Sequence, residues 1–137
     1  MRPARLEIDP SAIADNLRAV AGIVGPQVRL IAVVKADAYG HGALAASHAC
    51  LAAGADMLAV ALVEEALALR QAGILAPVMV LGALLPQQAG DLVAADLTAA
   101  VMDLDFARAL AAAAQEAGKC ARVHLKVDTG MSRAGVR

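Results

Sequence analysis

The chain has 137 residues, of which 60% are hydrophobic, and its aromatic residues are one tyrosine and one phenylalanine. Twelve basic and thirteen acidic side chains give a net charge of −1, so the chain lacks the basic surface and the stacking platform of a nucleic-acid-binding protein. Gly, Pro or charged residues interrupt every apolar stretch well before the length of a membrane span, and we expect no membrane segment.

The amino-terminal residues and the cysteines indicate the compartment. Met1 to Arg5 are basic but are followed by Leu6-Glu7-Ile8-Asp9, where a secretory signal would need an apolar core. We therefore expect a cytoplasmic protein. Cys50 and Cys120 lie far apart and lack the spacing of a metal site or a redox motif, so we expect no metal site and two reduced thiols in apolar surroundings.

Strands and helices are predicted to alternate along the chain. Residues 6–9 alternate like a short strand, and Asp9 or Ser11 can cap the amphipathic helix that follows. The later predicted strands are 29–34, 57–60, 78–81, 98–101 and 122–127. The predicted helices are 12–24, 42–53, 62–72, 86–93 and 104–117. This order predicts an α/β fold in one continuous piece, with parallel strands joined by helical crossovers.

Lys35 is the first candidate for chemistry, because it directly follows the apolar run 30–34. The carboxyl end of a strand is where α/β folds place their reactive groups. A lysine at the rim of an apolar surface loses hydration, which favours its neutral amine, and such an amine condenses with aldehydes. On position alone, a solvated lysine that caps the strand is the commoner alternative.

The residues Lys35-Ala36-Asp37-Ala38-Tyr39-Gly40-His41-Gly42 resemble the pyridoxal-phosphate lysine motif of the alanine racemases, a fold-type III family. The resemblance implies a parallel (β/α)8 TIM barrel, of which this chain is about half, since a whole barrel takes roughly 250 residues. It also implies that Lys35 carries pyridoxal 5'-phosphate as a Schiff base and that Tyr39 lies beside the cofactor phosphate. Many racemases have Asn at the position of Asp37. His41 is expected to be a structural donor outside the catalytic set.

A second motif runs from His124 to Gly135 and contains Lys126, Asp128 and Arg133. Period-two alternation places His124, Lys126 and Asp128 on one face of a strand, which in a barrel would look inward. An inward lysine is costly while charged, and its neutral amine can react with carbon dioxide to give a carbamate. The resemblance implies that Lys126 is N6-carboxylated and orients Arg133. From the residues alone, the alternative is a Lys126 ammonium paired with Asp128.

The resemblance also implies roles for residues around these two motifs. Arg133 would donate to the phenolic oxygen of the cofactor and lie near the substrate carboxylate, with Met131 beside it. Val33 and Leu81 would pack near the cofactor. Glu64 and Glu65 are expected to form a solvated first turn of a helix, favoured by the helix dipole.

The function implied by the resemblance is alanine racemisation, the interconversion of L-alanine and D-alanine that supplies D-alanine for peptidoglycan. Lys35 would be the base facing the D-enantiomer, in a cytoplasmic homodimer. The opposite base, the later barrel strands and the carboxyl-terminal β-domain are not among these residues, so residues 1–137 are expected to be the inactive amino-terminal portion of the cofactor-binding barrel. The alternatives are a non-catalytic scaffold fragment and a related racemase of broad amino-acid specificity.

Overall fold

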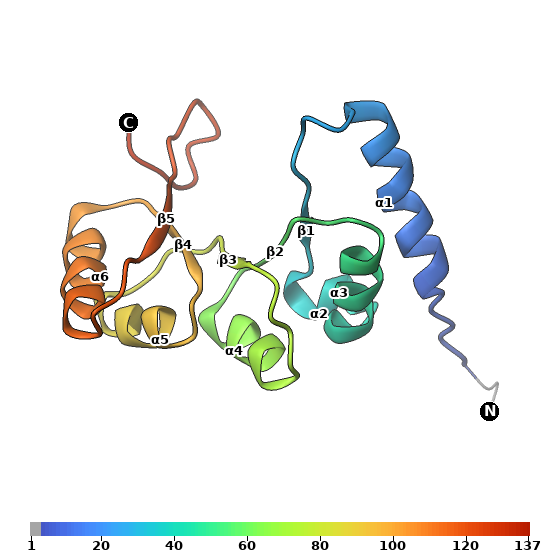
Figure 1. The fold of residues 1–137 in the computed structure, drawn as a ribbon. Helices are drawn as coiled ribbons and strands as arrows, with labels where there is room; N and C mark the ends of the chain where they lie inside the picture. Colours follow the sequence, from blue (N-terminus) through green and yellow to red (C-terminus); the bar gives the residue numbers. More distant parts are fainter. Residues whose placement is uncertain (1–3) are drawn as a thin grey trace.

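The computed structural model describes residues 4–137. Their five strands form one sheet in which neighbours in sequence are neighbours in space and every pair is parallel (Figure 1). The strands are β1 (Ile31–Val33), β2 (Met57–Val60), β3 (Val78–Val80), β4 (Thr98–Val101) and β5 (Arg122–Leu125). This sequential parallel order is that of consecutive units of a βα barrel, as the alternation of elements predicts.

The helices pack together on one side of the sheet, and all but the first connect successive strands (Figure 1). They are α1 (Pro10–Val24), α2 (Lys35–Gly40), α3 (Ala43–Ala52), α4 (Val63–Gln71), the 3-10 helix η1 (Pro86–Gln88), α5 (Ala89–Ala94) and α6 (Leu104–Glu116). Asp9 caps α1, since its carboxylate accepts hydrogen bonds from the backbone of Ser11 and Ala12. The structure thus confirms one of the two predicted caps.

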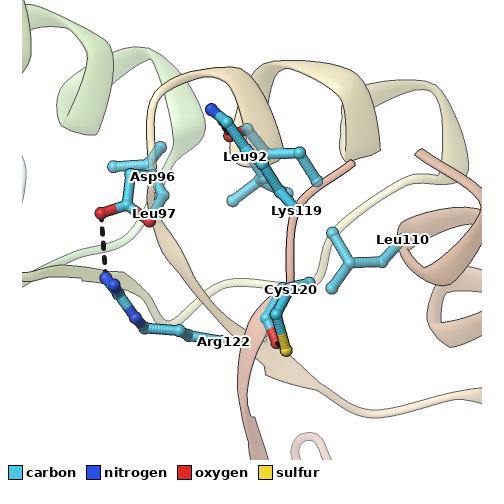
Figure 2. Close-up of a pocket in the computed structure, with 9 residues that line it drawn as sticks. Leu92, Asp96, Leu97, Leu110, Lys119, Cys120 and Arg122 are labelled. Carbon is cyan, nitrogen blue, oxygen red and sulfur yellow. Dashed lines mark hydrogen bonds and ion pairs between the residues drawn. The ribbon is translucent and has the colours of Figure 1, made fainter. Parts of the chain in front are cut away.

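Basic side chains tie the amino ends of the strands to the neighbouring helices. Lys119 Nζ donates to the carbonyl oxygens of Val93 and Ala94 at 3.0 and 3.3 Å, and Arg122 forms an ion pair with Asp96 at 2.9 Å. These groups line a cavity of about 420 Å³ (Figure 2). Each of these basic groups thus has a partner within the fold.

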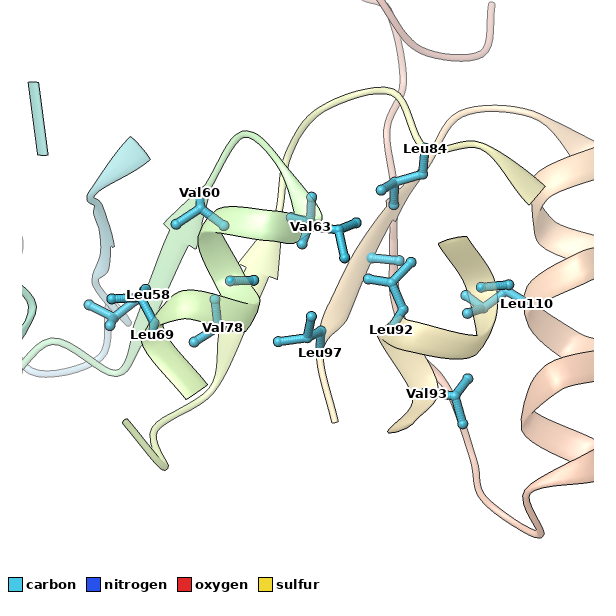
Figure 3. Close-up of a cluster of buried hydrophobic side chains, with 14 of the residues drawn as sticks. Leu58, Val60, Val63, Leu69, Val78, Leu84, Leu92, Val93, Leu97 and Leu110 are labelled. Atoms are coloured by element: carbon cyan, nitrogen blue, oxygen red, sulfur yellow. The ribbon is translucent and has the colours of Figure 1, made fainter. Parts of the chain in front are cut away.

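The core lies between the sheet and helices α4, α5 and α6 (Figure 3). Alternate strand residues enter it, as period-two geometry requires: Leu58 and Val60 from β2, Val78 and Val80 from β3, Ala99 and Val101 from β4. Ala99 is fully buried, and so are the four larger side chains of Leu58, Val60, Val78 and Val80. Each such side chain contributes about 1.5–3 kcal/mol by leaving water.

Four sequence-based expectations about local structure are wrong. Residues 6–9 form no strand, because no neighbouring strand pairs with them, and Asp9 instead starts α1. The strands predicted at 29–34 and 122–127 are shorter, and residues 35–40, for which no element was predicted, form α2. Cys50 is buried as expected, whereas Cys120 is exposed because it precedes β5, all of whose residues are exposed. Within residues 4–137, no helix has both the length and the apolar character needed to cross a membrane.

Candidate functional site

A cavity of about 380 Å³ lies at the carboxyl ends of the strands. Residues just after each of the five strands line it: Lys35, Ala61, Leu81, Gly82, Ala83, Met102 and Lys126. The loop after β5 adds Met131, Arg133 and Ala134. The fold therefore brings together five residues chosen from the sequence, although up to 98 positions separate them: Lys35, Leu81, Lys126, Met131 and Arg133.

The backbone after Lys35 adopts an uncommon conformation. Residues 36–39 have φ values between 50° and 56°, so α2 is one turn of left-handed helix. For residues other than glycine, this conformation costs roughly 1–2 kcal/mol per residue. Asp37 stabilises the end of the turn, because its carboxylate accepts a hydrogen bond of 2.6 Å from the backbone of Ala43. His41 Nδ1 lies 2.8 Å from the carbonyl oxygen of Ala38, so the ring acts as a structural donor, as expected.

Tyr39 and Val33 lie outside the lining of this cavity. The side chain of Tyr39 is 62% exposed, and Lys35 Nζ lies 5.8 Å from the centroid of its ring, within the range of a cation–π contact. Val33 ends β1 on the face that turns away from the helices, and it is also exposed. Tyr39 is therefore an exposed neighbour of the lysine.

The loop that carries Met131 and Arg133 is closed at its base. Val127 and Val136 form a β-bridge, with Asp128 N donating to Val136 O at 2.8 Å and Val136 N donating to Lys126 O at 2.9 Å. The Asp128 carboxylate, 6% exposed, accepts hydrogen bonds from the backbone of Ser132 and Gly130 at 2.9 and 3.1 Å. These bonds lower the pKa of Asp128 and keep it an anion.

Lys126 contacts a backbone carbonyl oxygen, whereas the alternative from the sequence was an ion pair with Asp128. Its Nζ donates to the carbonyl oxygen of Val127 at 2.9 Å, while the Asp128 carboxylate lies 3.7 Å from Nε of Arg137. The structure thus shows no pairing of Lys126 with Asp128 among its ion pairs in residues 4–137. Lys35, Lys126 and Arg133 give the cavity three cations, and its lining within the described chain holds no carboxylate. This charge favours an anionic ligand.

Glu65 is a residue of the site region that the sequence did not reveal. Both glutamates lie in the first turn of α4 as expected, and Glu64 is exposed. Glu65 is half-buried, and its carboxylate accepts hydrogen bonds from the backbone of Ala36, Ala61 and Leu62, which was not expected. Burial acts to raise the pKa of Glu65, but the bonds from these amides and the charge of Lys35 outweigh it and leave the pKa lowered. The available signal was the spacing from Leu62 to Glu65, which suits a glutamate that caps its own helix.

Comparison with known proteins identifies the family. The family model described as alanine racemase, N-terminal domain, matches residues 8–137.

The chain belongs to the alanine racemase family.

Its relatives in this family are similar over almost the whole chain. It is 46% identical over 135 residues to alanine racemase 2 of Caldanaerobacter subterraneus subsp. tengcongensis, covering 98% of this chain and 35% of that protein. It is 47% identical to the alanine racemase of Symbiobacterium thermophilum, covering 100% and 36%. The crystal structure of alanine racemase from a D-cycloserine-producing Streptomyces lavendulae matches with a TM-score of 0.90 and 38% identity, covering 100% and 36%.

These matches also show what part of an alanine racemase the chain corresponds to. It spans about a third of the length of the alanine racemases to which it is similar. The parallel five-stranded sheet with its helices is part of the barrel of an alanine racemase N-terminal domain, which confirms the expected fold class.

Proposed function

We propose that a family-length protein containing this chain is an alanine racemase that interconverts L-alanine and D-alanine with pyridoxal 5'-phosphate. The observation that carries the proposal is the convergence of Lys35 and Arg133 on one cavity at the carboxyl ends of the strands. Residues 1–137 would be the amino-terminal portion of the cofactor-binding barrel domain of a cytoplasmic homodimer. The reaction would supply D-alanine for peptidoglycan.

The residues around the cavity fit this cofactor. A phosphorylated aldehyde needs an amine for covalent attachment and positive charge near its anionic oxygens, and Lys35 and Arg133 offer these groups within one cavity of about 380 Å³. Leu81, Met102 and Met131 provide an apolar wall for a planar ring. When bound, pyridoxal 5'-phosphate supplies an electron sink that stabilises a carbanion at the substrate α-carbon.

In this proposal each residue of the chain has a distinct task. Lys35 would hold the cofactor through Nζ, and the same atom would move the substrate α-proton on the side of the D-enantiomer. Arg133 directs its guanidinium fork to the phenolic oxygen of the cofactor and the substrate carboxylate. Lys126, as a carbamate, orients Arg133, and Tyr39 lies on the phosphate side. Val33 and Leu81 flank the ring, and Met131 lies beside the substrate.

We infer that the chain of 137 residues by itself does not racemise alanine. Racemisation requires an acid or base on each side of the α-carbon, and Lys35 supplies one of them. The chain spans 35% of the length of its Caldanaerobacter relative, so in that protein most of the residues lie outside the region matched here. For this chain we propose cofactor attachment without turnover.

Borohydride trapping tests the assignment of Lys35. Pyridoxal 5'-phosphate is mixed with the chain, the imine is reduced, and labelled peptides are identified by mass spectrometry. Lys35 should carry most of the label, with Lys119 as the internal reference, because Lys119 Nζ is held by two carbonyl oxygens at the other end of the sheet. Preferential label on Lys119, or equal label in a Lys35→Ala variant, would show that the assignment is wrong. A chiral assay of the family-length protein tests for racemisation.

A further inference from the structure

Glu65 links the loop after β2 to the turn that carries Lys35. Its Oε2 accepts hydrogen bonds from the backbone of its own loop, from Ala61 at 2.8 Å and from Leu62 at 3.0 Å. Its Oε1 accepts a hydrogen bond of 2.6 Å from the backbone N–H of Ala36, which is 29 positions away in the sequence. One carboxylate therefore joins two loops at the edge where the cavity lies.

The amide that Glu65 holds is at a structurally decisive position. Ala36 directly follows Lys35 and is the first residue of the left-handed turn, with φ of 50° and ψ of 52°. Before it, the chain is fixed by the sheet, where Val34 N donates to Ala59 O at 2.8 Å. The direction of the Lys35 side chain is set between these two points. Because alanine, aspartate and tyrosine resist φ above zero, contacts from elsewhere in the fold must hold this turn.

We propose that Glu65 is a positioning residue for Lys35, holding the left-handed turn at Ala36 so that the lysine amine points into the cavity. The role of Lys35 in this statement rests on the proposed function, whereas the hold on Ala36 does not. Glu65 itself is absent from the lining of the cavity, so it acts through the backbone of the turn.

The chemistry of the contacts specifies a carboxylate at this position. All three partners are N–H donors, and they approach both oxygens of the side chain. A carboxylate only accepts, whereas an amide has one accepting oxygen and one NH2 group that donates. Glu65→Gln would therefore set a donor against either Ala36 or the pair Ala61 and Leu62. Aspartate keeps the charge but is shorter by one methylene, so it cannot span the two loops in this way.

Proton NMR of the unmodified chain gives a test that needs no variant. If the Glu65 carboxylate accepts from Ala36, the amide protons of Ala36, Ala61 and Leu62 should shift together on acidification, with one common midpoint. The amide of Ala43, which donates to Asp37 instead, should follow a different carboxyl group. An Ala36 amide proton that does not titrate with those of Ala61 and Leu62 would overturn the proposal.

Variants extend the test to the amide and to the lysine. In Glu65→Gln, hydrogen exchange at the Ala36 amide should accelerate by about tenfold or more, as expected for loss of a hydrogen bond to a charged group. Borohydride-trapped pyridoxal 5'-phosphate on Lys35 should fall several-fold relative to Lys119. Glu64→Gln is the matched control, because Glu64 is the exposed neighbour on the same helix turn, and it should leave both readouts unchanged.

Rescue by glycine separates positioning of Lys35 from capping of α4. Glycine adopts φ above zero without steric cost, so Ala36→Gly added to Glu65→Gln should restore most of the Lys35 labelling. It cannot replace the cap at Leu62, so the thermal stability lost through α4 should not return. Labelling that stays low, or that returns only with stability, would show that Glu65 merely caps its helix.

The two proposals fail in different ways. If Lys35 is not labelled in the unmodified chain, the proposed cofactor role is wrong, while the common titration of the three amides still decides the role of Glu65. If Lys35 is labelled equally in the unmodified chain and in a folded Glu65→Gln variant, the cofactor role stands and the positioning role is wrong. If Glu65→Gln does not fold, the amide titration of the unmodified chain still tests whether Glu65 holds Ala36, and separate titration of the Ala36 amide would overturn the proposal.

Discussion

The backbone N–H of Gly82 donates to the carbonyl oxygen of Ala61 at 3.1 Å, and a Cβ atom added to Gly82 would overlap that same oxygen. Gly82 follows β3 and Ala61 follows β2, and both line the cavity. Two loops that line the cavity thus approach each other closely at this point, and a residue without a side chain is required there.

Gly82→Ala should therefore destabilise the chain by about 1–3 kcal/mol, the usual cost of forcing an extra carbon into a packed region. Gly90→Ala is the matched control, since Gly90 lies in α5 and an added Cβ meets no atom within 4 Å. That change should stabilise by about 0.5–1 kcal/mol, because alanine favours helix. Urea unfolding of both variants measures the difference. Equal stability of Gly82→Ala and the unmodified chain would contradict the close approach.

Acid should remove the stabilisation that Glu65 provides. The pKa of Glu65 is lowered in the folded chain, so its contribution is complete above the unfolded-state pKa of about 4.3 and is lost as the pH falls through the lowered folded-state value. The difference in unfolding free energy between the chain and Glu65→Gln should thus shrink below about pH 4.3. Urea titrations between neutral and acid pH measure it. A difference that stays constant with pH would count against the hydrogen-bonded carboxylate.

The order of strands and helices was predictable because it depends on local patterns. Apolar runs such as 31–34 and 78–81, separated by helical segments, specify parallel strands with crossovers, and the structure confirms them. Lys35 follows the first strand and Arg133 lies in the loop after the fifth, so both residues fall on the same edge of the sheet. That Lys35 and Arg133 share one site was implied by the resemblance to the alanine racemases, and both residues line the same cavity.

The left-handed turn and the role of Glu65 could not be predicted in this way. No residue from Ala36 to Tyr39 is a glycine, so nothing local signals φ above zero. The spacing of Leu62 and Glu65 indicates a helix cap, but the third hydrogen bond, to Ala36, depends on the packing of two loops. Both features depend on tertiary contacts, which the conformational propensities of the individual residues do not indicate.

Asp128 should control the loop that carries Arg133. In Asp128→Ala, the amides of Gly130 and Ser132 lose their acceptor, so both should exchange faster and the loop should loosen. Trapping of pyridoxal 5'-phosphate on Lys35 should fall several-fold if Arg133 helps to bind it. Asp105→Ala is the control, because Asp105 is exposed on α6, far along the chain from this loop. Unchanged exchange at Gly130 and Ser132 would refute the role of Asp128.

Arg133→Lys should lower the rate of alanine racemisation in the family-length protein by at least about tenfold, with little change in stability. A lysine keeps the positive charge but not the planar fork that holds two oxygens in fixed directions. Arg133 is exposed and forms no ion pair among those found in residues 4–137, so its replacement removes little from the fold. Steady-state kinetics and thermal melting measure the two effects. Equal turnover of the two proteins would show that Arg133 has no such role.

Lys126 should carry a carboxyl group in the family-length protein. Lys35, Lys126 and Arg133 line one cavity, and a carbamate on Lys126 would place an anion among the two other basic groups. The neutral amine of Lys126 can attack carbon dioxide and lose a proton, and the resulting carbamate changes a cation beside Arg133 into an anion. Carbon-13 NMR with labelled bicarbonate should give a carbamate signal that disappears in Lys126→Ala and persists in Lys119→Ala. The persistence is expected because Lys119 Nζ already donates to two carbonyl oxygens at the opposite end of the sheet. A signal that survives Lys126→Ala, or no signal near neutral pH, would show that Lys126 remains an ammonium bound to the Val127 carbonyl oxygen.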